Sequence, residues 1–177
     1  MLKSYEILVK SIDNQNKDHK QMVKLNEFKK SLAFTLKWEG TYSNDKDDPG
    51  GETKWGISKR AYPNLDILNL TPEQAASIYA NDYWDKAGCD QIPFPFCTAV
   101  FDSAVNLGVG RVLGWLKEAK DVKAFLDKRR RFYYDRVNKS PTSVKYLKGW
   151  LNRLNDLSKF VDTNTNPVGE DRKDVNS

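Results

Sequence analysis

The sequence of 177 residues has few of the side chains on which metal and nucleophilic chemistry depend. Its one histidine, His19, lies in a polar stretch, where we expect a solvated side chain. Its two cysteines, Cys89 and Cys97, are too few for a zinc cluster, and we expect reduced thiols in preference to a disulfide across that short loop. We therefore expect no metal and no other cofactor, and Ser-His or Cys-His catalysis finds no support.

A long apolar run is also missing. No segment approaches the roughly 18–20 apolar residues that span a bilayer, and the charged N-terminus offers only Ile7-Leu8-Val9. We expect a globular monomer without a transmembrane segment or signal peptide, made in the cytoplasm. Delivery to the cell wall or periplasm would then need another system, such as a holin, a virion or a secretion apparatus.

The net charge of +5 is unevenly distributed, because residues 111–153 hold 13 Lys and Arg against 4 Asp and Glu. Such a basic region attracts polyanions: nucleic acid, anionic membrane or an anionic bacterial envelope. A nucleic-acid binder is one alternative, since residues 128–134 mix basic and aromatic side chains. No recognised nucleic-acid motif is present, so we expect no nucleic-acid partner.

Helical periodicity dominates the pattern. Apolar spacing from Leu2 to Ile12 predicts a short helix, and the polar residues 13–21 predict a linker or a helix break. A second helix is predicted from Leu25 to Leu36, with Gly40 just past its end. Its last turn would include Glu39.

Further helices are predicted downstream. Thr71-Pro72-Glu73-Gln74 combines an N-cap, a first-turn proline and a capping box, and starts a helix that runs to about residue 87. The remaining patterns predict helices at about 96–107, 112–119, 122–137 and 141–161. We divide the chain into a helical extension with linker (1–20), a catalytic domain (21–161) and a disordered tail (162–177).

Residues 41–54 break the helical pattern. Several acids, Pro49, Gly50 and Gly51 predict a turn-rich loop or a small β-hairpin. The predicted fold class is therefore mostly α, an α+β domain with one small β excursion after the helix that carries Glu39.

The same stretch holds the candidate chemistry. Glu39 at a helix end faces a loop with further carboxylates, and glycoside hydrolysis asks for one protonated acid and a second carboxylate. An acid-rich loop is also typical of an ordinary solvated turn. A calcium loop is a further alternative through Asp45, Asp47 and Asp48, although a distal glutamate at EF-hand spacing is missing.

Residues 34–58 resemble the N-terminal signature of glycoside hydrolase family 108, in Glu39-Gly40-Thr41-Tyr42 and Gly50-Gly51-Glu52-Thr53-Lys54-Trp55-Gly56-Ile57. The resemblance extends over about residues 27–157, through Tyr83-Trp84, residues 102–108 and residues 148–153. It implies a lysozyme-like fold that cleaves peptidoglycan, with Glu39 as the catalytic acid. Relatives often carry a peptidoglycan-binding stretch after the position of Gly110, which this sequence lacks.

The spacing is also similar to that of phage-type lysozymes. Eight residues separate Glu39 from Asp48, and four separate Asp48 from Thr53, one fewer than in those enzymes. The similarity implies that Asp48 activates or orients the water and that Thr53 helps to hold it. Asp45 and Asp47 remain alternatives for the second carboxylate.

Six further residues are candidate substrate contacts. Tyr42 and Trp55 flank the acid and could stack on sugar rings, and Gly51 lets backbone approach one. Asp102 and Asn106 share a helix face, where they either line the cleft floor or form a packing pair. Asn44, in the acidic loop, completes the set.

These residues predict a muramidase that cleaves the β-1,4 bond between N-acetylmuramic acid and N-acetylglucosamine. The expected partners are the glycan strand and, through the basic C-terminal half, the anionic envelope. A lytic transglycosylase and an inactive wall-binding scaffold are the alternatives. The sequence leaves open whether the reaction inverts or retains configuration, and whether the protein is an endolysin, a virion lysin or an effector.

Overall fold

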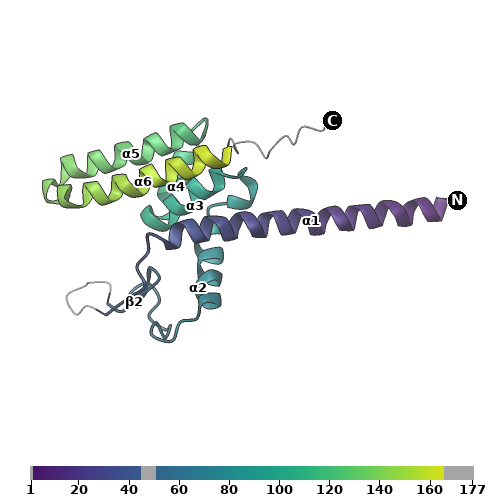
Figure 1. Cartoon of the computed structure of the whole chain (residues 1–177), viewed down its shortest axis with the longest axis horizontal. Helices are drawn as coiled ribbons and strands as arrows, with labels where there is room; N and C mark the ends of the chain where they lie inside the picture. Colours follow the sequence, from purple (N-terminus) through teal and green to yellow (C-terminus); the bar gives the residue numbers. More distant parts are fainter. Residues whose placement is uncertain (1, 45–50, 166–177) are drawn as a thin grey trace, which may run out of the picture.

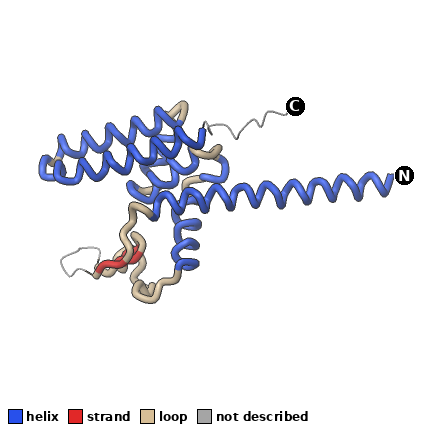
Figure 2. Tube along the Cα trace, viewed as in Figure 1, coloured by secondary structure: helices blue, strands red, loops and turns tan. Residues whose placement is uncertain are grey.

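The structure, a computed structural model, describes residues 2–44 and 51–165, with side chains from residue 18 onward. Within these ranges the chain is mostly helical with one small sheet, which confirms the predicted fold class (Figure 2). The α-helices are α1 (Leu2–Leu36), α2 (Pro72–Tyr79), α3 (Phe96–Leu107), α4 (Val109–Leu116), α5 (Val122–Lys139) and α6 (Val144–Thr165). Short π and 3₁₀ segments are η1 (Ala80–Asp85), η2 (Cys89–Gln91) and η3 (Pro141–Ser143).

Helix α1 is continuous, so the predicted break at residues 13–21 is wrong. The segment is polar, but residues 2–36 contain neither glycine nor proline, and nothing interrupts the backbone hydrogen bonds. Figure 1 shows the N-terminal part of α1 projecting from the rest of the molecule. Met22, Val23 and Leu25 on this part are exposed.

The sheet lies between α1 and α2 in sequence and is antiparallel, in the order β1-β2-β3. Each strand is two residues long: β1 (Tyr42–Ser43), β2 (Thr53–Lys54) and β3 (Ile57–Ser58). The predicted small β excursion is thus present. It forms a lobe of its own with the loops that lead to α2 (Figure 1).

Local signals fixed several helix ends. The predicted capping box of α2 is formed, with the Thr71 hydroxyl accepting from the Gln74 N–H and the Gln74 side chain accepting from the Thr71 N–H. Gly88 follows η1 in the left-handed conformation. The last helix extends to Thr165, so residues 162–165 of the predicted tail are helical, and residues 166–177 lie outside the described part.

The core is organised around α3, whose residues from Cys97 to Ala104 are all buried. Two side-chain hydrogen bonds join α1 to α3. The Ser31 and Thr98 hydroxyls are hydrogen-bonded at 2.7 Å, and the Thr35 hydroxyl donates to the Asp102 carboxylate at 3.2 Å. Both cysteines are free and buried, as expected, and burial raises the pKa of the Cys97 thiol to about 11. Helices α5 and α6 pack side by side above α3 (Figure 1). No helix in the described ranges has the length and apolar character to cross a bilayer.

Candidate active site

Glu39 lies just beyond α1, where the chain leaves the helix for the sheet. The N–H groups of Lys37 and Trp38 donate to the carbonyls of Phe34 and Thr35, a tight turn that ends the helix at Leu36. Glu39 therefore lies past the last helical turn, and the prediction that it lies within that turn is wrong. The Trp38 indole is anchored by a hydrogen bond to Asp156 of α6 at 3.2 Å.

The side chain of Glu39 is held by the last helix. Oε1 of Glu39 lies 2.8 Å from a guanidinium nitrogen of Arg153, and the two side chains are 18% and 7% exposed. An ion pair so far out of water is much less screened than one on the surface. It fixes one carboxylate oxygen and leaves the other, Oε2, to face the sheet.

Arg153 is itself part of a buried charged cluster. Asp102 on α3 is fully buried and lies 2.7 Å from guanidinium nitrogens of both Arg129 and Arg153. Burial opposes ionisation of Asp102, but the two arginines outweigh it and hold its pKa below the ordinary value. Burial also opposes the charge on Arg153, and the carboxylates of Asp102 and Glu39 together raise its pKa. No buried side-chain nitrogen or oxygen in the described ranges lacks a hydrogen-bond partner.

This cluster corrects the predicted role of Asp102. Its side chain has 0% exposure, so it does not line the cleft floor and cannot touch a glycan. It instead holds Arg153, which holds Glu39. The amide oxygen of Asn106 is half-buried and accepts from Tyr133 at 2.8 Å and from Arg129 at 3.3 Å, so this residue extends the same network.

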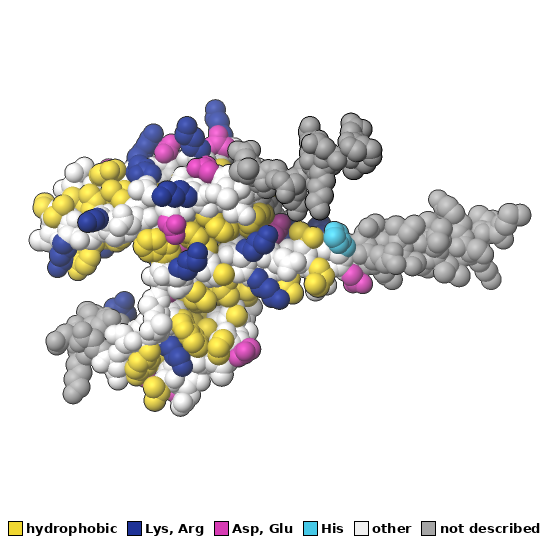
Figure 3. Space-filling model, in the orientation of Figure 1, with side chains coloured by type: hydrophobic (Ala, Val, Ile, Leu, Met, Phe, Trp, Pro, Cys, Tyr) yellow, Lys and Arg dark blue, Asp and Glu magenta, His cyan; other side chains and the backbone are white. Residues whose placement is uncertain are grey.

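Glu39 opens onto a cleft of about 190 Å³. Figure 3 shows the molecule hollowed between the lobe of α5 and α6 and the lobe that contains the sheet. The lining residues are Glu39, Gly40, Thr41, Tyr42, Ser43, Thr53 and Gly56. Among these, Glu39 is the carboxylate, and its surroundings are hydroxyls, backbone and one aromatic ring.

Gly56 gives Glu39 its room. A Cβ on Gly56 would lie 2.7 Å from Oε2 of Glu39 and 2.9 Å from the Tyr79 hydroxyl, and the residue has φ +75°. A side chain is thus excluded both by the backbone conformation and by the acid. Buried Tyr79 donates to the Trp55 carbonyl at 2.6 Å, and burial, followed by the charge of Glu39, raises its pKa.

The other predicted residues fall into two groups. Tyr42 and Thr53 line the cleft; the Thr53 hydroxyl donates to the Gly51 carbonyl at 3.1 Å, and the Tyr42 hydroxyl donates to Glu52 at 2.9 Å. Asn44, Gly51 and Trp55 lie beside it on the sheet and its turns, with no contact that assigns them to a substrate.

The second carboxylate is not located. Asp48, with its rivals Asp45 and Asp47, lies outside the described residues. The described residues contain no group of His, Cys, Asp and Glu that could hold a metal ion.

Sequence reasoning missed Arg153, Arg129 and Tyr79. Arg153 interrupts an apolar stripe of α6 between Leu151 and buried Leu154, and an arginine at such a position signals a buried partner. Its partner could not be read from spacing, because Glu39 and Asp102 lie on other elements.

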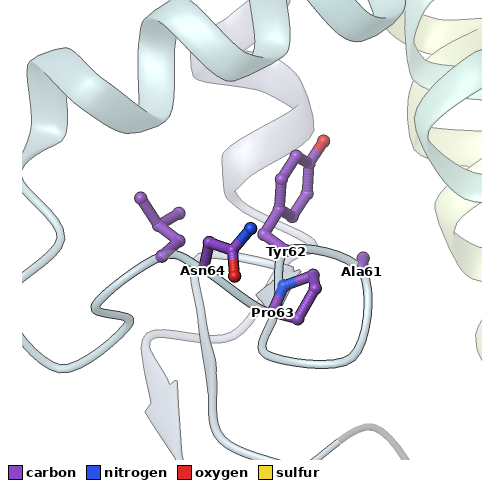
Figure 4. Close-up of a pocket in the computed structure, with 5 residues that line it drawn as sticks. Ala61, Tyr62, Pro63 and Asn64 are labelled. Atoms are coloured by element: carbon purple, nitrogen blue, oxygen red, sulfur yellow. The ribbon is translucent and has the colours of Figure 1, made fainter.

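A different hollow of about 340 Å³ is formed by the loop Ala61, Tyr62, Pro63, Asn64 and Leu65 (Figure 4). It contains no carboxylate, and the Tyr62 hydroxyl, its one acidic group, donates to Asp82 at 2.9 Å. Burial, followed by the Asp82 contact, raises the pKa of that phenol further. The hollow therefore has no group that could act as a general acid near neutral pH.

Part of the chain matches a known family of glycosidases. The model of the family described as Glycosyl hydrolase 108 matches residues 32–108, a range that contains the acid, the sheet and α3. The predicted family is confirmed over this range, whereas residues 109–157 of the predicted resemblance lie beyond the match. Arg153 and Arg129, which complete the charged cluster, also lie outside the match.

The fold has a solved relative. The chain is similar to the protein described as "Structure of Brucella abortus SagA", with a TM-score of 0.60 and 24% identity over 76% of this chain and 94% of that one. At this identity the likeness concerns the fold alone. No curated protein matches the chain.

Proposed function

We propose that this chain, which matches glycosyl hydrolase 108 over residues 32–108, is a peptidoglycan hydrolase, a muramidase with Glu39 as its general acid. The observation that carries the proposal is the Glu39 carboxylate in the lining of the cleft, with one oxygen held by Arg153 and the other in no ion pair with any residue that the structure describes. Glu39 lies within the matched range, and the resemblance described for residues 34–58 implies that it is the acid.

In this proposal the two carboxylate oxygens have different tasks. Oε1 is occupied by Arg153, so the transferred proton is carried by Oε2, beside Gly56. A glycosidic oxygen placed at Oε2 would receive the proton as its bond to the sugar breaks. The ion pair then holds the carboxylate that remains, which favours the later stage of proton transfer.

Thr53, which we assign to the attacking water, lies on the sheet side of the cleft. The Thr53 hydroxyl gives its proton to the Gly51 carbonyl and keeps its lone pairs for a water in the cleft. By the phage-type spacing, Asp48 activates that water. The basic α5 and α6 would attract the anionic envelope, and delivery to the wall depends on another system.

Digestion of purified peptidoglycan tests the proposal. Wild type should release muropeptides with reducing N-acetylmuramic acid ends, identified by mass spectrometry, and Glu39→Gln should lower the rate at least about a hundredfold, since a general acid contributes ~10²–10⁴. Glu73→Gln makes the same chemical change on the exposed first turn of α2 and should stay near wild type.

Two other results would replace the proposal. Anhydro products from wild type would make the chain a lytic transglycosylase, which needs only the acid. Release of nothing by a folded wild type would favour a wall-binding scaffold.

A further inference from the structure

Helix α6 carries aromatic side chains on the same face as Arg153, the residue that contacts Glu39. Tyr146, Trp150 and Arg153 are spaced i, i+4 and i+7, so they share one face of the helix. Arg153 on this face contacts Glu39. At 1.5 Å per residue, Trp150 and Tyr146 lie about 4.5 Å and about 10.5 Å along the axis from Arg153. The face thus leads outward from the proposed acid.

The rings on this face are fixed in place. Tyr146 and Trp150 stack at 5.9 Å between centroids with 29° between planes, and Trp150 stacks on Tyr133 at 5.3 Å and 21°. Tyr133 is buried, and its hydroxyl bonds Asn106 and Arg129 of the charged network. The outer rings therefore rest on a rigid base and lose little conformational freedom when a ligand binds.

The outer rings are also open to solvent. Tyr146 is 53% exposed, and Trp150 is partly exposed. Arg136 lies 5.5 Å from the Trp150 ring centre, and the Lys145 amine lies 5.0 Å from that of Tyr146. An exposed tyrosine ring, with one cation over it and another over the neighbouring tryptophan, suits a ligand with an apolar ring face and polar or anionic edges.

We propose that Tyr146, supported from beneath by the Trp150 ring, forms a sugar-binding subsite, on which the glycan strand stacks after it leaves the Glu39 cleft. The identity of its ligand rests on the proposed function. Its position is inferred from the shared helix face that links it to Arg153 and so to Glu39. Amphipathic aromatic rings bind the C–H faces of pyranoses while hydroxyls at the edge remain hydrated. A second protein is a poorer occupant, because two side chains fall far short of the ~1,200 Å² of a stable interface.

The test measures binding without turnover. In a Glu39→Gln background, calorimetry compares the β-1,4-linked dimer and hexamer of N-acetylglucosamine. Tyr146→Ala should weaken hexamer binding about three- to tenfold, the worth of one aromatic contact, and leave dimer binding unchanged. Tyr146→Phe should restore hexamer binding, because it keeps the ring.

Tyr134→Ala is the matched control, since Tyr134 on α5 is 46% exposed and outside the aromatic row. Equal losses for dimer and hexamer, equal losses in the Tyr134 variant, or no loss at all would overturn the subsite. A change of oligomeric state in Tyr146→Ala, seen by sedimentation, would make the face a contact between copies and would also overturn it.

Catalysis is scored separately by digestion with the wild-type chain. A length-dependent loss in Tyr146→Ala together with no digestion by wild type would support the subsite and remove the muramidase. Digestion by wild type, with hexamer binding unchanged in Tyr146→Ala, would support the muramidase and overturn the subsite.

Discussion

The helical wall of the cleft is held by buried charges, whereas the opposite wall is held by three strands of two residues each. On the helical side, Arg153 and Asp102 are buried, and every oxygen of Asp102 has partners. On the sheet side, Tyr42 is 43% exposed and Thr53 is partly exposed. Under the proposed function, the difference corresponds to two roles: the buried charges hold the acid, and the more exposed sheet carries the groups that we assign to water and substrate.

Removing the central charge should have the largest effect. Asp102→Asn leaves Arg129 and Arg153 without their buried counter-charge, so we expect a loss of about 3–5 kcal/mol in the free energy of unfolding. At roughly 2–4 °C per kcal/mol for a chain of this size, Tm should fall by about 6–20 °C. Asp127→Asn, the same change on the exposed side of α5, should shift it within error.

The pH dependence of unfolding sharpens this prediction. The folded pKa of Asp102 is depressed. Its stabilisation is therefore fully present above the unfolded pKa of ~3.9 and is lost as pH falls through that value toward the lower folded one. Denaturant titrations between pH 6 and pH 3 should show the wild type losing more stability than Asp102→Asn. Parallel losses in the two proteins would contradict an ionised Asp102.

Crowding the acid should affect rate more than stability. Gly56→Ala places a methyl group against Oε2 of Glu39 and forces a strained backbone, so we expect kcat to fall on the order of a hundredfold. Gly88→Ala is matched for strain, because Gly88 has φ +68° and nothing within 4 Å of an added Cβ. We expect both variants to lose about 1–2 kcal/mol in the free energy of unfolding, and only Gly56→Ala to lose activity. An active Gly56→Ala enzyme would contradict the assignment of Oε2 as the proton carrier.

The sheet wall should show the smallest effect. Thr53→Val removes one hydroxyl that we assign to the water, and one hydrogen bond is worth about 0.5–1.5 kcal/mol, so kcat should fall no more than about tenfold. Thr53→Ser should restore the rate, and the melting temperature should barely change in either variant. A loss as large as that of Glu39→Gln would move Thr53 into the proton-transfer chemistry.

Local chemistry explains what the sequence could predict. Helix α3 matches its predicted range because Gly108 ends it, and α2 begins where its capping box predicts. The break in α1 was wrong because polarity alone does not end a helix that lacks glycine and proline. The resemblance to the family predicted Glu39 as the acid, and the structure has Glu39 among the residues that line a cleft.

Tertiary contacts explain what the sequence could not predict. Spacing put Asp102 and Asn106 on one face of α3, but α3 is surrounded, so a shared face does not say whether it meets substrate or core. Arg153 was missed because its partners come from α3 and from the end of α1, and no local pattern links residues so far apart.

The pairing of Glu39 with Arg153 also bears on when the protein becomes active. A ribosome makes the chain from its N-terminus, so the acid and its sheet emerge long before the last helix. Until α6 docks, Glu39 lacks the cation that holds it, and Asp102 lacks one of its two counter-charges. Under the proposed function, a truncated or incomplete chain contains the acid without the arginine that holds it. Under that function, Glu39 is therefore held in its working position only once the final helix has docked.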